Sequence, residues 1–382
     1  MKSIILHSKL NIDSREFYIH TGSIPDKKSI LSEVFEKGKF ISSKELSFKI
    51  RDPEDQKAQI NYLKSRTADL HKDTIEEINM LFYIQSKIRP LKLYLAHFKL
   101  GAIFYYRSII SEAIKNFQQT IELKPDFIPA YMNLGRCYMR IGEYKKAVEI
   151  LKEAYKANSE YPDLANSLGV ALTFMQEYQK ATSILQQALK KNPDYAEANF
   201  NLGVALFRST VADSDMHERA VIPSRVIRYI KSLMELERYK DEYWLETFDN
   251  TLNNISEGNL PEILSSLEKL QLKLITYLKI DTLVESFYLR FMYGGRELDY
   301  KELEAYEERI LKLTAERKDF ADYWNEMGTV HIIQCRHLFL QAVRELEKAV
   351  ELNNDYTEAS KNLKLVGNIK KGFLILLRAI LK

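Results

Sequence analysis

The sequence predicts a mainly α protein, a solenoid of stacked helical hairpins preceded by a small α+β unit. Three observations lead to this fold class. A short motif recurs at a constant interval in the first half of the chain. Gly and Pro are scarce, at 13 and 9 of 382 residues, which favours long helices over many short strands. The first 50 residues instead form short runs rich in Ile, Tyr and Phe, which is typical of strands.

The recurring motif is a Leu-Gly pair that returns every 34 residues, with glycines at Gly101, Gly135, Gly169 and Gly203. In the first three copies an Ala follows twelve residues later, and four residues beyond it stands a large apolar residue, at Phe117, Leu151 and Leu185. This spacing predicts two antiparallel helices per unit, because apolar residues three and four apart share one helix face. Gly and Ala let the two backbones approach closely. One hairpin cannot bury its own apolar face, so the units must stack.

This pattern resembles the tetratricopeptide repeat, which implies a right-handed superhelix of helical hairpins. The resemblance covers residues 94–127, 128–161 and 162–195, and the first helix of a unit that starts at 196. A further copy is predicted near the carboxyl end, where Trp324 and Gly328 open the pattern. Its turn between helices would carry an insertion of two residues.

The chain accordingly divides into five predicted segments. They are a small ββαβ unit (1–50), a helical lead-in (51–93), the repeat array (94–207), an atypical helical region or degenerate repeats (208–320), and a repeat-like segment with a terminal helix (321–382). In the first segment, strands are expected at Ser3–Leu10, Glu16–Thr21 and Phe40–Phe48, with a helix at Pro25–Lys37 that ends at Gly38.

The connecting segments are also predicted to be helical. The lead-in is expected as two helices, because Asp73 with Glu76 three residues later forms a capping signal. Residues 208–221 are polar and predict a loop. Further helices are then expected at 224–239, 241–256, 261–278, 281–292 and 299–317.

The resemblance also implies a binding site. In tetratricopeptide-repeat proteins the first helix of each unit lines a concave groove that holds a partner. Transferring those positions by the glycine register gives a candidate groove set: Phe98, Lys99, Tyr105, Tyr106, Met132, Asn133, Arg136, Met139, Arg140, Asn166, Ser167, Val170, Phe174, Phe200, Asn201, Val204, Phe207 and Arg208. Asn side chains suit an extended peptide backbone, and Arg side chains suit carboxylates. The alternative is that the Asn residues belong to the repeat consensus and that the aromatic residues pack between helices.

One family variant, the clamp that grips the acidic tails of chaperones, is disfavoured. It needs Lys and Asn in one unit, Asn in the next and two basic residues in the third. The corresponding residues here are Phe98, Ala102, Asn133, Asp163 and Ser167, of which Asn133 alone fits.

Other classes of function find little support in the sequence. A net charge of +3 does not indicate nucleic-acid binding. His331 and Cys335 stand four residues apart and share a helix face, but two ligands make a poor zinc signature. No nucleophile stands at a recognisable spacing from a base. We therefore expect no catalysis, no cofactor and no resident metal, with an enzyme or metal site in 208–320 as the least favoured alternative.

The expected function is a scaffold or adaptor that binds a peptide or helix of another protein in the concave groove. Two cysteines, Cys137 and Cys335, form no disulfide framework, which favours the reducing cytoplasm. An alternative is a peripheral membrane protein anchored by residues 366–382, a basic and strongly apolar tail. That tail also suits the cap that ends a solenoid.

Overall fold

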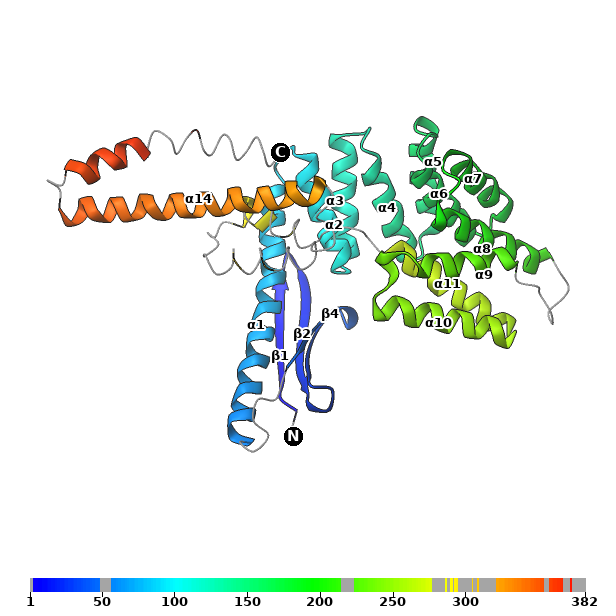
Figure 1. The fold of residues 1–382 in the computed structure, drawn as a ribbon, viewed down its shortest axis with the longest axis horizontal. Helices are drawn as coiled ribbons and strands as arrows, with labels where there is room; N and C mark the ends of the chain where they lie inside the picture. The colour runs from blue at the N-terminus through cyan, green and yellow to red at the C-terminus, as the bar shows by residue number, and fades with distance from the viewer. Residues whose placement is uncertain are drawn as a thin grey trace. The chain divides into compact units, whose positions relative to one another are not determined.

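The computed structural model describes residues 3–48, 56–213, 223–276, 321–353 and 357–366, with isolated residues between 286 and 308 and at 372. The chain divides into two compact units, made mainly of residues 1–91 with 281–382, and of residues 92–280. The mainly helical fold with an amino-terminal sheet confirms the predicted fold class (Figure 1).

The first unit contains a four-stranded antiparallel sheet in the order β1-β2-β3-β4. Its strands are β1 (Ile5–Ile12), β2 (Arg15–Ile24), β3 (Ser29–Glu36) and β4 (Lys39–Ser47). Two-residue turns with positive φ join β1 to β2 and β3 to β4, at Asp13-Ser14 and Lys37-Gly38. Such turns match the twist of the strands that they connect.

The helix expected at Pro25–Lys37 is instead a short 3-10 helix, Pro25–Lys27, followed by β3. Ile30, Ser32 and Val34 alternate into the sheet's buried face, which is a period of two. Its apolar residues also fit a helical period, because Ile30 and Val34 stand four apart. All of β3 pairs with Phe17–Ile24 of β2, and this pairing selects the strand period, so the unit is not ββαβ.

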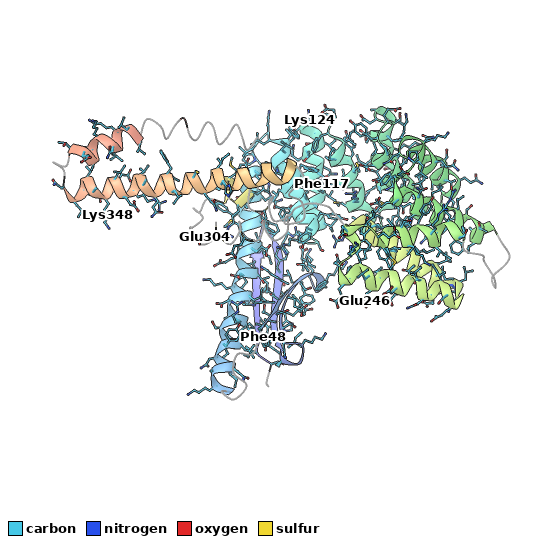
Figure 2. All side chains as sticks on the ribbon, viewed as in Figure 1. Phe48, Phe117, Lys124, Glu246, Glu304 and Lys348 are labelled. Atoms are coloured by element: carbon cyan, nitrogen blue, oxygen red, sulfur yellow. The ribbon has the colours of Figure 1, made fainter. Side chains whose placement is uncertain are left out.

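Helix α1 (Gln56–Ile88) packs against β1, β2 and β3. It is one helix and not the two that were expected, and it runs through Asp73 and Glu76 without a break. Its buried stripe includes Leu63 and Leu70, which form a core cluster with Ile30 and Phe48. Figure 2 labels Phe48 in this unit. Because the apolar stripe of α1 packs continuously against one face of the sheet, the helix does not end at Asp73 despite the capping signal there.

A polar network lies between α1 and the sheet. The two ring nitrogens of His71 on α1 are hydrogen-bonded to Ser8 Oγ at 2.7 Å and to Thr21 Oγ1 at 2.8 Å. Thr21 is also bonded to Ser32 Oγ at 2.8 Å. Burial, together with the nearby His7, lowers the pKa of His71 below its ordinary value of 6.5, because the charged imidazolium is poorly solvated there.

The second unit begins with helices that alternate direction along the chain (Figure 1). They are α2 (Tyr94–Tyr106), α3 (Ile110–Leu123), α4 (Ile128–Arg140), α5 (Tyr144–Ala157), α6 (Pro162–Phe174), α7 (Tyr178–Lys191) and α8 (Ala196–Asp213). Each packs against the next along the chain. Pro129 and Pro162 stand in the first turns of α4 and α6, where no intrahelical N–H partner is lost.

The repeated glycines set the distance between the helices of a hairpin. A Cβ at Gly135 would lie 2.7 Å from Leu151 Cγ, and one at Gly169 would lie 2.5 Å from Leu185 Cγ. In the first hairpin the equivalent contact of Gly101 is the ring of Phe117, at 2.9 Å (labelled in Figure 2). These distances are too short for any side chain, so glycine is required for the backbones to meet.

The fourth hairpin is completed by α9 (Ser224–Met234). A Cβ at Gly203 on α8 would meet Val226 Cγ2 at 2.8 Å, the contact that Leu185 makes with Gly169 one unit earlier. Val226 follows its glycine by 23 residues, whereas Leu185 follows by 16. Residues just beyond Arg208, expected as a loop, continue α8 to Asp213. The start of the 208–320 segment therefore completes a helical hairpin, with seven more residues between the two contacting positions than in the preceding hairpin.

Two more helices follow, α10 (Glu242–Glu257) and α11 (Leu260–Thr276), after the 3-10 helix at Glu237–Tyr239. Asp241 caps α10 by accepting a hydrogen bond from the backbone N–H of Trp244 at 2.9 Å. Gly258 ends α10 in the left-handed conformation, as glycine allows without strain. The described parts of this segment agree with the expected helices at 241–256 and 261–278.

Helix α14 (Ala321–Leu352) differs from the predicted last repeat. It runs unbroken where a turn between two helices was expected, between Gly328 and Ala342. That stretch has no Gly, Pro or Asn to end a helix, and its residues are compatible with helix throughout. Residues 357–366 are helical as expected, and the rest of the tail proposed as cap or anchor lies outside the described residues, Gly372 excepted. Among the described helices none is long and apolar enough to cross a membrane.

We predict that Gly169→Ala destabilises the array by about 1–3 kcal/mol, the usual cost of forcing an extra carbon into a packed contact. The added Cβ would overlap Leu185. Urea unfolding followed by circular dichroism measures the loss. Gln186→Ala, at an exposed position next to Leu185, serves as the control and should leave stability unchanged. Equal stability of the two variants would contradict the packing argument.

We also predict that the sheet unit loses stability as pH falls below about 6.5. The unfolded chain then protonates His71, whereas the folded chain, with its lowered pKa, resists until a lower pH. His71→Gln should remove this dependence and keep the amide available for Ser8 and Thr21. Thermal unfolding at about pH 5 and about pH 7.5 tests this, with the exposed His331→Gln as control. A pH dependence that survives in His71→Gln would rule out this histidine as its source.

Candidate functional site

The first helices of the repeats meet around a pocket of about 420 Å³ in the second unit. Its wall consists of side chains from α2, α4, α6 and α8, together with Tyr195, Tyr239 and the last turns of α11. This volume falls within the usual range for ligand pockets. The lining residues are Phe98, Pro129, Met132, Asn133, Arg136, Met139, Asp163, Asn166, Ser167, Val170, Tyr195, Glu197, Asn201, Tyr239, Gln271, Leu274 and Ile275.

Half of the candidate groove set lines this one pocket. Those that do are Phe98, Met132, Asn133, Arg136, Met139, Asn166, Ser167, Val170 and Asn201. The glycine register therefore places side chains from four repeats around a common space. The repeat pattern did not indicate Glu197, Tyr195 or Tyr239, because these residues lie at helix starts or in connections outside the transferred positions.

The remaining candidates lie elsewhere, and most have packing partners. Phe200, Val204 and Phe207 are fully buried in a core cluster with residues of α9, α10 and α11. Phe174 stacks on Tyr144, with ring centroids 5.1 Å apart. Arg208 forms an ion pair with Glu268 at 3.3 Å. These side chains stabilise the solenoid.

At the carboxyl end of α2, the candidate residue Arg140 is also engaged in contacts within the protein. Arg140 donates hydrogen bonds to the carbonyl oxygen of Tyr105 at 2.9 Å and to Ser108 Oγ. Tyr105 is buried, and burial raises its pKa to about 12. Tyr106 is largely exposed and borders a separate hollow with α10, and Lys99 is half-buried. A charge reversal at Arg140 would disturb α2 as well as any ligand.

Helix α11 lies across the groove and occupies part of it. Gln271 Nε2 donates to Asn201 Oδ1 at 3.1 Å, so a side chain of the protein itself satisfies a groove asparagine. The Tyr105 hydroxyl donates to the Ile275 carbonyl at 3.3 Å. Ile275 packs in the core cluster that contains Met139 and Val170. One of the protein's own helices therefore fills this part of the groove.

The other faces of α11 are also covered. Leu267 and Leu270 are fully buried in the cluster formed with α9 and α10. Lys273 donates from Nζ to the Tyr243 carbonyl and to Thr247 Oγ1 on α10. Burial lowers the pKa of Lys273 to about 8. Every residue of α11 from Ile263 to Ile275 except Lys269 is buried or half-buried, so α11 is packed into the unit.

A chain of side-chain amides runs along the pocket. Gln271 donates to Asn201, Asn201 Nδ2 donates to Asn166 Oδ1 at 2.9 Å, and Asn166 Nδ2 donates to the Tyr195 hydroxyl at 3.3 Å. Burial, followed by the charge of Asp163, raises the pKa of Tyr195.

The described residues offer little for catalysis. Burial raises the pKa of the Cys137 thiol, which removes the thiolate needed for nucleophilic attack. His331 and Cys335 are both exposed on α14. No group of three or more metal-ligating side chains comes together in the described part of the chain. The pocket's groups are arranged for hydrogen bonding and charge pairing.

The consecutive hairpins define an α-helical solenoid with a concave face, the architecture of repeat proteins that bind other proteins. Its units are tetratricopeptide repeats, as the motif predicted. A family model described as "Tetratricopeptide repeat" matches residues 167–209. A second model, "Regulator of microtubule dynamics protein 1-3", matches residues 105–178. No curated protein matches the chain.

Solved structures with similar segments include MamA, with 20% identity, 46% of this chain and 97% of that chain covered, and a TM-score of 0.29. YrrB, titled "a TPR protein with an unusual peptide-binding site", shows 18% identity, with 55% and 98% covered and a TM-score of 0.31. A tetratricopeptide repeat protein from Parabacteroides merdae shows 14% identity, with 72% and 98% covered and a TM-score of 0.30. TM-scores this low do not extend the likeness to the arrangement of the whole chain.

We predict that Ile275→Ala loosens α11 from the groove and destabilises this unit by about 2–5 kcal/mol, the usual cost of truncating a buried Ile. Urea unfolding measures the change. Lys269→Ala, at an exposed position on the same helix, should cost far less. If both variants unfold like wild type, the packing of Ile275 does not stabilise α11 against the repeats.

Proposed function

We propose that this protein is a non-catalytic scaffold that binds a segment of another protein in the part of the concave groove that α11 leaves open. The observation that carries this proposal is the convergence of nine predicted groove residues on one pocket of about 420 Å³. Repeat solenoids bind partners through such concave surfaces. The described side chains support recognition better than reaction, because no nucleophile, base and metal set accompanies the pocket.

The shape of the pocket limits what enters it. Gln271, Leu274 and Ile275 of α11 form one wall, so a long helix along the whole groove would collide with α11. A short extended segment, or a single side chain with its flanking backbone, fits the remaining space. On α4, Met132 and Met139 give the pocket adaptable apolar surface, and Asn133 offers hydrogen bonds to a backbone.

We predict that Met132→Trp blocks partner binding, because the larger side chain fills the pocket from a half-buried position on α4. Full-length protein with a photo-crosslinking phenylalanine analogue at Phe98 would be irradiated in native lysate. Mass spectrometry then identifies any partner peptide crosslinked at position 98. This peptide should be found when Met132 is retained and should be absent from the Met132→Trp variant.

Lys145→Trp, on the exposed side of α5, is the matched control and should retain the crosslink. Arg140 is avoided because it ties α4 to α2. Thermal unfolding verifies that both variants fold. A crosslink that persists in folded Met132→Trp would refute groove binding and redirect attention to the sheet unit or α14.

A further inference from the structure

The pocket contains three ionisable side chains that can carry charge at neutral pH, and two of them are acidic. Arg136, Asp163 and Glu197 all line it. Arg136 Nη1 donates to Asn133 Oδ1 at 3.2 Å. The Tyr239 hydroxyl donates to Glu197 Oε1 at 2.9 Å. The ionised pocket therefore carries a net negative charge, inside a chain whose overall charge is +3.

All hydrogen bonds of the amide chain run in the same direction. At its end, Asn166 Nδ2 donates to the Tyr195 hydroxyl. Asn166 then accepts from Asn201, which accepts from Gln271. Every amide in the chain has its orientation fixed by its neighbour.

This polarity leaves an acceptor at the far end of the chain. Gln271 is fully buried, its Nε2 is committed to Asn201, and its Oε1 has no hydrogen-bond partner among the described residues. A buried acceptor without a partner is unfavourable, and Gln271 lines the pocket. A ligand that presents N–H donors would satisfy it.

The walls suit a long stem that ends in a polar head. Phe98, Met132, Met139, Val170 and Leu274 supply apolar surface around the same space. Lys and Arg bury their methylene stems along such surface and direct the charged head toward acceptors. A ligand carboxylate would instead meet two like charges, Asp163 and Glu197, against the single opposite charge of Arg136. Asp163 also occupies a position where the acidic-tail clamp requires a basic residue.

We propose that the pocket binds a basic side chain, Arg or Lys, from a short segment of the partner protein. Asp163, Glu197 and Gln271 Oε1 serve as its acceptors, and the apolar walls hold its stem. This inference rests on the proposed scaffold function and adds the chemistry of the residue that is recognised. Arg presents five donors in a planar fork and so can contact carboxylate and amide acceptors together.

The test uses full-length protein and positional peptide libraries, random heptapeptides with the central residue fixed as Arg, Lys, Gln, Glu or Leu, measured by fluorescence anisotropy. The Arg library should bind at least about tenfold more tightly than the Glu library, as expected for a charge-assisted pair. Glu197→Gln and Asp163→Asn should each weaken binding of the Arg library several-fold. Glu149→Gln, an exposed carboxylate on α5, should not. Thermal unfolding confirms that the variants fold.

The outcomes separate this inference from the scaffold function. Binding that Met132→Trp abolishes, but that shows no basic preference or an acidic one, overturns the basic-residue inference and leaves groove binding intact. A basic preference that survives both Glu197→Gln and Asp163→Asn also overturns it, because other acceptors would then be responsible. Libraries that do not bind, or whose binding Met132→Trp leaves unchanged, overturn groove binding of such segments as well.

Discussion

The close approach of two helices at each repeated glycine determines the geometry of the second unit. Without a Cβ at Gly135 or Gly169, the facing leucine packs directly on the backbone. The same contact recurs in the fourth hairpin, where Val226 takes the leucine's place after a longer connection. The contact is therefore retained while the chain between its partners changes length. Each first helix then presents its opposite face to a common groove, from which the pocket is built.

The groove is shared between the repeats and α11. Tyr105, Asn201 and Met139 are groove-side residues that contact or cluster with α11, whereas Asn133 and Arg136 border the open pocket. The amide chain connects the two parts, since it begins at Gln271 on α11 and reaches Asn166 on α6. Packing and recognition thus use the same set of polar side chains, and the orientation of one limits the others.

The repeat array could be predicted because its signal is local: Leu, Gly and Ala recur within single hairpins. Strand β3 was missed because Ile30 and Val34 fit both periods, and pairing with β2 settles the choice. The prediction of a turn within α14 was wrong, because no residue type between Gly328 and Ala342 ends a helix. The occupation of the groove was not predictable, since Gln271 meets Asn201 across 70 residues and nothing near either residue signals the contact.

Because α11 is covalently linked to the repeats, its presence in the groove does not depend on protein concentration. A tethered helix acts at a high effective concentration, and α11 adds its own core contacts to this advantage. A soluble peptide that displaces α11 from Asn201 would need an affinity that few peptides reach. Inhibitors that imitate peptides spanning an entire repeat groove should accordingly fail against this protein, and compact molecules should succeed.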